Sequence, residues 1–317
     1  MKFIPWDVKW LPELVKLWNL ELGTDFPMRE ELIQQNSFQD HTVLKSASHI
    51  AINDDKMIVG FIVAKKIQKQ MDIQLNTEVG WIQVLLVHSD FRNKGIGSAL
   101  LTKAEDTLKN QGSKTIFLGR DPGHYFPGVP VKYETTKRWF EHKGYQAIGI
   151  ESDLVRNFKD DEIEPVQSIK DIQISLVKQN EQNDLLSFLH HCFPGRWEYE
   201  AAQYFENGGT GREFVIFKKN NQIIGFCRIN DSKSPIIGPN VYWSPLFHGE
   251  LGGIGPLGID SAERKNGYGL AIVKAGIAYL RGRQIDSIVI DWTGLVDFYQ
   301  KLNFTIWKQY QQYSKNI

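Results

Sequence analysis

The sequence predicts an α/β (α+β) fold with two tandem domains, each built on a mixed β-sheet that is covered by helices on both faces. Strand-like apolar runs alternate with helical patterns along the chain. The order strand, polar glycine loop and helix occurs twice, and Arg264 of the second copy follows Arg92 of the first by 172 positions. A period of this length is far above that of a solenoid repeat, so it indicates a duplicated domain.

Hydrophobic periodicity places the elements of the first half. The expected order is strand 2–5, helices 10–18 and 28–35, strands 49–52, 57–64 and 78–87, the first glycine loop, a helix to residue 109 ended by Gly112, strand 114–118, helix 135–142 and strand 145–155. Residues 120–130 contain three prolines and two glycines without periodicity, so they are expected to form a shaped loop. Strand 145–155 is expected to close the first domain.

The second half repeats this order. The expected elements are strand 172–176, helices within 183–205, strands 213–218, 222–230 and 250–259, the second glycine loop, helix 270–280 capped by Gly282, strand 287–291, a helix around Phe298 and the segment 304–313. Charged residues and Pro165 in between resemble a linker. We therefore expect a first domain at 1–157, a linker at 158–170 and a second domain at 171–317.

Each glycine loop has the chemistry of an anion site. Gly95 and Gly97, like Gly267 and Gly269, allow a tight turn, so that free N–H groups at the start of the following helix point at one spot. These donors, the helix dipole and a neighbouring arginine favour a phosphate or pyrophosphate. An ordinary strand-to-helix turn is the alternative for one copy alone. Neither loop has the Lys-Ser/Thr pair of a P-loop, which argues against ATP.

The pattern Arg-x-x-Gly-x-Gly, following a strand that ends at Val87 or Ile259, resembles the acetyl-CoA-binding motif of the GCN5-related N-acetyltransferase (GNAT) family. The resemblance covers nearly all of both halves and implies tandem GNAT domains with mostly antiparallel sheets. It also implies acetyl-CoA as co-substrate and no metal. The implied cofactor-binding residues are Leu85, Val87, Arg92, Asn93, Lys94, Gly95, Ile96 and Gly97 in the first half, and Leu257, Ile259, Arg264, Lys265, Asn266, Gly267, Tyr268 and Gly269 in the second.

Acetyl transfer to an amine needs a base, because an alkylammonium has a pKa of roughly 10. Glu78 and Glu250 stand at matching positions at the start of the strand before each loop, where GNAT enzymes often carry such a carboxylate. A solvated glutamate at a strand end is the alternative for either residue. Pro256 inside the second of these strands indicates a bulge that could free a backbone N–H for the oxyanion, or else an edge strand.

The leaving thiolate needs a proton, and family members often supply it from a tyrosine in a Phe-Tyr-x-x-x-Gly/Asn-Phe pattern. The second half has this pattern with Tyr299, whereas the first half has Phe140 at that position. Phenylalanine cannot donate a proton, so Tyr125 or Tyr133 would have to replace it there. We therefore expect catalysis mainly in the C-terminal half. A packed aromatic is the alternative role for Tyr299.

Composition limits the function classes. The 37 basic and 37 acidic residues cancel, so no broad field attracts nucleic acid or an anionic membrane. Two cysteines without ligand spacing argue against a disulfide frame or a metal site, and no run resembles a signal peptide or membrane span. We expect a cytoplasmic N-acetyltransferase, monomeric or homodimeric, that acts on a primary amine of an amino sugar, polyamine, antibiotic or peptide. A non-catalytic acyl-CoA-binding or regulatory protein is the alternative.

Overall fold

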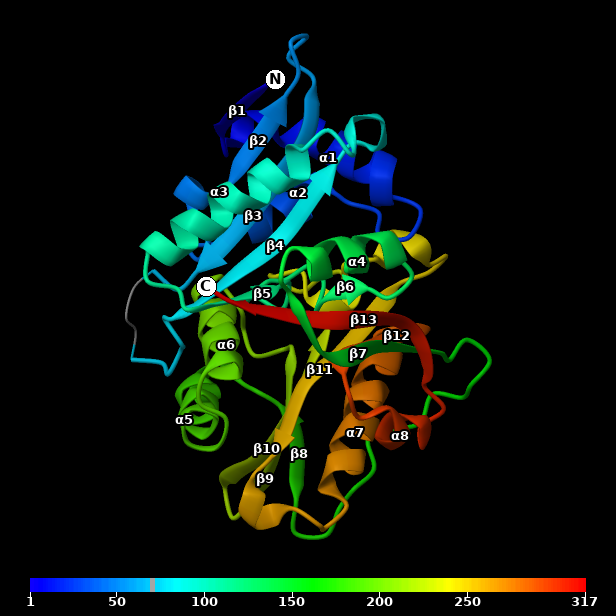
Figure 1. The fold of residues 1–317 in the computed structure, drawn as a ribbon. Helices are drawn as coiled ribbons and strands as arrows, with labels where there is room; N and C mark the ends of the chain where they lie inside the picture. The colour runs from blue at the N-terminus through cyan, green and yellow to red at the C-terminus, as the bar shows by residue number, and fades with distance from the viewer. Residues whose placement is uncertain (69–71) are drawn as a thin grey trace. The chain divides into compact units, whose positions relative to one another are not determined.

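The computed structural model describes residues 1–68 and 72–317 (Figure 1). Of these, one compact unit holds 1–68, 76–151 and 309–317, and the other holds 72–75 and 152–308. We call them the first unit and the second unit and describe each by itself.

The first unit contains a sheet with strand order β1-β2-β3-β4-β5-β13, and β6 pairs with β13. Its elements are β1 (Lys2–Pro5), η1 (Val8–Trp10), α1 (Leu11–Leu22), α2 (Glu30–Ile33), η2 (Gln34–Phe38), η3 (Lys45–Ala47), β2 (His49–Ile52), β3 (Ile58–Lys66), β4 (Val79–Val87), η4 (Ser89–Phe91), α3 (Ile96–Asn110), β5 (Thr115–Leu118), β6 (Val129–Pro130), α4 (Glu134–His142) and parts of β7 (Gln146–Asn157) and β13 (Thr305–Asn316). All residues of β3 are buried, because helices cover both of its faces.

The second unit repeats this arrangement with strand order β8-β9-β10-β11-β12-β7. Its elements are the rest of β7, β8 (Gln173–Leu176), η5 (Gln179–Glu181), α5 (Gln182–Cys192), α6 (Arg196–Glu206), β9 (Phe214–Lys219), β10 (Gln222–Asn230), η6 (Pro239–Val241), η7 (Ser244–Leu246), β11 (Leu251–Ile259), η8 (Ser261–Glu263), α7 (Tyr268–Gly282), β12 (Ser287–Thr293), α8 (Val296–Gln300) and the start of β13. The long helix α7 packs on β9, β10 and β11 (Figure 1).

The predicted fold class, α/β (α+β) with mixed and mostly antiparallel sheets, is confirmed. The pairs β4–β5 and β11–β12 are parallel, whereas the pairs β1–β2, β2–β3, β3–β4, β5–β13, β6–β13, β7–β12, β8–β9, β9–β10 and β10–β11 are antiparallel. Gly112 follows α3 in the left-handed region, as expected for a helix end, whereas Gly282 lies inside α7, which ends at that residue with Arg283 as its cap. Helical backbone continues past Leu280 because Arg281 is held by Asp286 and by the carbonyl of Ile285.

The two units exchange their last strands: part of β7, which was expected in the first domain, belongs to the second sheet, and part of β13, which was expected in the second domain, belongs to the first sheet. Residues 152–157 of β7 pair with β12 in the second unit, and residues 314–316 of β13 pair with β5 in the first. Strand 145–155 therefore does not close the first domain alone. Segment 158–170 is not a free linker, because Phe158 is buried in the core of the second unit and Ile169 packs against that core. Alternation along a sequence identifies a strand but not its partner.

Candidate active site

Both glycine loops have the backbone of an anion-binding turn. Gly95 and Gly267 adopt φ values of +82° and +77° immediately before α3 and α7. No atom lies within 4 Å of the position that a Cβ would take at either glycine, so the approach to both turns is open. The first N–H groups of a helix lack intrahelical partners, and an anion satisfies them well.

The arginines that precede the two turns are held in the same way. Arg92 Nε donates to the carbonyl of Val87 at 3.0 Å, and Arg264 Nε donates to that of Ile259 at 3.3 Å. The first unit adds a carboxylate: Glu21 forms an ion pair with Arg92 and accepts the N–H of Ser89. The structure records no such ion pair for Arg264 within residues 1–68 and 72–317. The first loop is thus already partly neutralised.

The other predicted cofactor residues lie on or beside the turns. Asn93 and Lys265 adopt positive φ values of 60° and 68° in the two loops. Lys94 Nζ donates to the carbonyl of Asp90, and Asn266 Nδ2 donates to that of Glu263. The remaining ones are strand and helix residues adjacent to the loops: Leu85 and Val87 on β4, Ile96 and Gly97 on α3, Leu257 and Ile259 on β11, and Tyr268 and Gly269 on α7.

The strands β11 and β12 pair only as far as Ile254 and Ile290, although both continue. The register between β10 and β11 shifts there, so that Gly255 and Pro256 form a bulge, as the proline predicted. Gly255 adopts φ +131°. The two parallel strands therefore diverge next to a residue that has no side chain.

Asp291 lies at this divergence, and the sequence analysis missed it. A Cβ on Gly255 would be 3.5 Å from Asp291 Oδ1, and Asn240 Nδ2 donates to the same oxygen at 3.0 Å. Burial, together with the charges of Asp153 and Glu200, raises the pKa of Asp291 to about 7, and Arg196 opposes this rise. A carboxyl group that titrates near neutral pH is suited to proton transfer.

Tyr299 is buried at 6% exposure and belongs to the core of the second unit. Burial raises the pKa of its hydroxyl, and the charges of Cys227 and Asp291 raise it further. Tyr299 packs against Phe298, and Phe298 in turn lies 3.7 Å from the Cβ position of Gly269. The tyrosine is therefore adjacent to the side chain that packs beside the start of α7.

Glu78 and Glu250 are exposed and immediately precede β4 and β11. Glu78 forms an ion pair with Lys114 at 2.5 Å on the surface. Glu250 stands five positions before Gly255, or about 16 Å along a strand. Their role as bases stays a prediction, and Asp291 lies closer to the divergence than Glu250 does.

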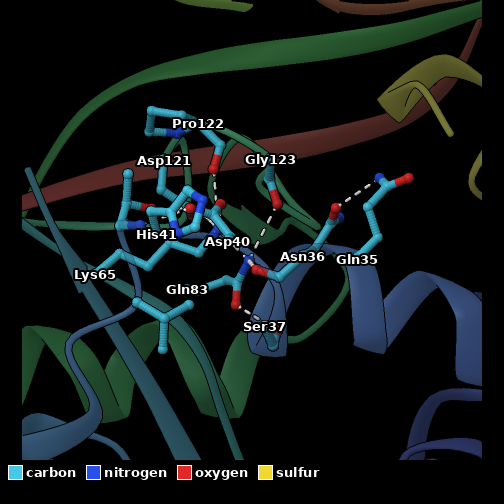
Figure 2. A network of polar contacts seen from close by, with 12 residues as sticks. Gln35, Asn36, Ser37, Asp40, His41, Lys65, Gln83, Asp121, Pro122 and Gly123 are labelled. Atoms are coloured by element: carbon cyan, nitrogen blue, oxygen red, sulfur yellow. Dashed lines mark hydrogen bonds and ion pairs between the residues drawn. The ribbon is translucent and has the colours of Figure 1, made fainter. Parts of the chain in front are cut away.

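The first unit fills the equivalent place with its own side chains (Figure 2). The register between β3 and β4 shifts at Gln83, the counterpart of Gly255. Gln83 Nε2 donates to the carbonyl of Gly123 at 3.0 Å, and its oxygen accepts from Ser37 at 2.7 Å. These bonds hold the loop 119–130 against the bulge.

A buried cation fixes the same loop. Lys65 is fully buried and contacts Asp40 and Asp121 at 2.8 Å each, and its Nζ donates to the carbonyl of Pro122 at 2.9 Å (Figure 2). Burial alone would lower the pKa of Lys65, but the charges of Asp121 and Asp40 raise it. The cation offsets one of the two negative charges, and the network fixes the loop in the place that is open in the second unit.

Neither Tyr125 nor Tyr133 takes the place of Tyr299 in the first unit. Phe140 is buried, and Tyr125 shares a 2.7 Å hydrogen bond with Ser37. Tyr133 donates to Asp25 at 3.4 Å, and burial together with that carboxylate raises its pKa to about 12. Both hydroxyl groups are thus occupied.

A cavity of about 610 Å³ adjoins the loop of the second unit. Its lining includes Gly267, Lys274, Lys301 and Arg281, and part of the segment 158–170 forms another wall.

Within the described residues there is no group of three or more His, Cys, Asp or Glu side chains that could hold a metal ion. Across residues 1–68 and 72–317, no helix is both long and apolar enough to cross a membrane. Cys192 and Cys227 are free thiols.

In each unit one of two parallel, paired strands leads to an anion-binding turn, and in the second unit this strand diverges from its partner; the arrangement suits group-transfer proteins that hold a phosphorylated carrier. Consistent with this, the sequence model described as "Acetyltransferase (GNAT) family" matches residues 11–125 and 183–304. The chain therefore belongs to the GNAT family of acetyltransferases, which use acetyl-CoA. The predicted tandem GNAT architecture is confirmed.

Characterised relatives point the same way. The chain is 32% identical over 242 residues to a mycothiol acetyltransferase of Renibacterium salmoninarum, an alignment that covers 73% of this chain and 66% of that protein. It is 36% identical over 137 residues to a mycothiol acetyltransferase of Thermobispora bispora, covering 38% and 40%. The chain thus spans less than two thirds of the length of either relative.

Solved structures share the fold. The GCN5-related glucosamine N-acetyltransferase region of a fungal multi-domain GH3 β-N-acetylglucosaminidase superposes with a TM-score of 0.86 at 23% identity, over 99% of this chain and 38% of that one. A GCN5-related N-acetyltransferase from Sphaerobacter thermophilus gives a TM-score of 0.70 at 14% identity, over 99% and 95%. These identities speak for the fold alone.

Proposed function

We propose that this chain transfers an acetyl group from acetyl-CoA to a primary amine of a small molecule, and that the second unit carries the catalysis. One observation carries the proposal: Asp291 lies beside Gly255 where β11, the strand that leads to the loop at Gly267, diverges from β12, and its charge acts on the hydroxyl of Tyr299. The first unit has Gly119 and Phe140 at the corresponding positions.

The residues around the second loop fit coenzyme A. The open turn at Gly267 and the guanidinium of Arg264 would hold its pyrophosphate, and Lys274 and Lys301 in the adjoining cavity would favour the rest of its nucleotide part. When bound, acetyl-CoA supplies an acyl thioester that an amine can attack. The first loop, with Glu21 on Arg92, would bind the same carrier more weakly.

Asp291 and Tyr299 divide the proton transfers. An amine with a pKa of roughly 10 is protonated at neutral pH and must lose a proton before it can attack. Asp291, with a pKa of about 7, is ionised in a large fraction of molecules at that pH and can accept the proton at a carboxylate oxygen. Tyr299 stays protonated, so its Oη holds a proton ready for donation. We assign these roles in preference to Glu78 and Glu250.

The surroundings of Asp291 favour a cationic acceptor. Asp153 and Glu200 carry two negative charges there against the one positive charge of Arg196. Because two relatives are named mycothiol acetyltransferases, an acceptor of the mycothiol type belongs among the first amines to test, beside amino sugars, polyamines, antibiotics and peptides. The expected monomer or homodimer, cytoplasmic location and absence of nucleic-acid partners stay predictions.

The test is thiol release from acetyl-CoA in the presence of a panel of these amines. We expect saturable turnover with at least one small primary amine. A rise in melting temperature on adding acetyl-CoA, without turnover on any amine, would instead support the binding-only alternative.

A further inference from the structure

A chain of buried polar side chains leads to Asp291 through the interior of the second unit. Arg228 Nε donates to Asn230 Oδ1 at 3.2 Å, Asn230 Nδ2 donates to Asn240 Oδ1 at 2.9 Å, and Asn240 Nδ2 donates to Asp291 Oδ1 at 3.0 Å. Arg228, Asn230 and Asn240 are 6%, 0% and 1% exposed. Buried polar side chains that hydrogen-bond in series restrict one another's orientation.

The chemistry of Arg228 fixes the direction of the whole chain. A guanidinium can only donate, so the oxygen of Asn230 must face it and the amide nitrogen of Asn230 must face Asn240. By the same reasoning, Asn240 turns its own nitrogen toward Asp291. Both amide orientations thus follow from the cation at the far end of the chain.

The backbone around the two asparagines is shaped for them. A Cβ on Gly253 would lie 2.0 Å from Asn240 Oδ1, and one on Gly238 would lie 2.6 Å from Asn230 Nδ2. No other residue could occupy either glycine position without moving an asparagine. Asn240 Nδ2 also reaches the carbonyl of Gly255 at 3.4 Å, so it connects the bulge of β11 to β12 across their divergence.

We propose that Asn240 is a positioning residue for Asp291, oriented through Asn230 by Arg228. The inference rests on the proposed function, in which Asp291 receives the proton of the amine. Asn240 donates to Oδ1 of the ionised Asp291 and fixes the orientation of the carboxylate. The second carboxylate oxygen, Oδ2, is then left to accept the proton of the amine substrate. The further charged or titratable groups that act on Asp291 are Asp153 of β7, Arg196 and Glu200 of α6, and Tyr299 of α8.

The experiment measures the titration of Asp291 directly, by NMR of protein labelled with carbon-13 at the aspartate carboxyl groups, with Asp291→Asn to assign the signal. Asn240→Leu removes a donor that favours the charged form, so the pKa of Asp291 should rise from about 7 by about one to two pH units. The acidic limb of kcat/KM should move upward by the same amount. Gly253→Ala, which displaces Asn240, should shift both in the same direction.

Gly252→Ala is the matched control, because its Cβ would meet Ile285 and Leu280 instead of Asn240. It should leave the titration of Asp291 unchanged. A folded Asn240→Leu protein in which Asp291 titrates as in the wild type would overturn the inference. If Asn240→Leu does not fold, the same result for Gly253→Ala would overturn it. Full acetyl transfer by Asp291→Asn would instead refute the proposed role of Asp291, whatever the titration shows.

Discussion

The two units differ most where their central strands diverge, although they share one strand order. The first unit has Gln83 at the bulge and Gly119 after the neighbouring strand, whereas the second has Gly255 and Asp291. Each unit thus has one glycine and one polar side chain at these two positions, but on opposite strands. In the first unit Gln83 fills the space at the bulge and holds a loop. In the second unit Gly255 leaves that space free, and Asp291 lines it with a titratable acid.

The polar interior of each unit follows from this difference. Lys65 and Asn230 occupy the same place in the two sheets, opposite Trp81 and Gly253. Lys65 pairs with the two carboxylates that hold the loop 119–130, while Asn230 donates to Asn240 and thereby orients its amide. In the proposed function, the first copy of the duplicated domain therefore contributes structure, and the second carries the groups that transfer protons.

The largest expected effect comes from removing the acid of the second unit. Asp291→Asn should lower kcat/KM by about 10²- to 10⁴-fold, the usual contribution of a positioned base. In the wild type the activity should rise with pH through about 7, because only the ionised carboxyl accepts a proton, and the variant should lose this limb. Thiol release measured between pH 5.5 and 9, a range set about that pKa, checks both statements.

Stability provides the control for this variant. Because the folded-state pKa of Asp291, about 7, lies above the ordinary value of 3.8, stability falls as the pH rises between these two values, and the loss is complete above about 7. Asp291→Asn should therefore melt no lower than wild type under alkaline conditions. If Asp291→Asn is active and Glu250→Gln is inactive, the base is the glutamate at the strand start, as the sequence predicted.

The next effect is that of the hydroxyl which distinguishes Tyr299 from Phe140. Tyr299→Phe should lower kcat by roughly a hundredfold and leave the affinity for acetyl-CoA nearly unchanged, since the hydroxyl acts mostly in the transition state. Phe140→Tyr is the reciprocal variant and should add no activity, because the first unit lacks a counterpart of Asp291. Activity of Tyr299→Phe equal to wild type would assign Tyr299 to packing.

A third variant tests whether the network around Lys65 in the first unit is structural. Lys65→Met leaves Asp40 and Asp121 without their buried cation and should lower the free energy of unfolding by about 3–5 kcal/mol. Denaturant unfolding measures this loss, and Lys109→Met, at an exposed lysine of α3, serves as control. A loss below about 0.5 kcal/mol, as for an ordinary surface substitution, would contradict the role given to the network.

The smallest effect concerns the first loop. Glu21→Gln removes a carboxylate from Arg92 and should strengthen binding of CoA to the first unit by a few-fold, the usual size of a partly exposed charge contact. Calorimetry in a Gly267→Val background, which disables the second loop through its left-handed backbone, isolates this site. Unchanged affinity would mean that Glu21 does not compete with the ligand.

Much of the fold follows from the sequence because periodicity and turn chemistry are local. β1, β2 and β10 have the predicted bounds, and the bulge at Pro256 follows from the missing N–H of proline. The exchanged strands could not be predicted, since a strand pattern does not name its partner.

Less of the site could be predicted. The loops and Tyr299 carry recognisable patterns, whereas Asp291 is a single acid at a strand end. The repeat contained the missing signal, because the 172-residue interval sets Asp291 opposite Gly119 and Gly255 opposite Gln83. The two residues of each pair are chemically unlike, so the sequence repeat alone does not draw attention to them. Their correspondence becomes informative only when the position of the bulge is known. The contacts of Asn240 depend on tertiary packing that no local pattern encodes.

The exchanged strand also affects how the protein is made. Residues 309–317 supply the strand beside β5, so the first unit leaves the ribosome with an open sheet edge that stays unpaired while residues 152–308 are synthesised. At about 5–20 residues per second, this interval lasts on the order of ten to thirty seconds. The unit translated first is thus completed last, and a nascent chain that stalls before residue 309 exposes an edge that can pair with other chains.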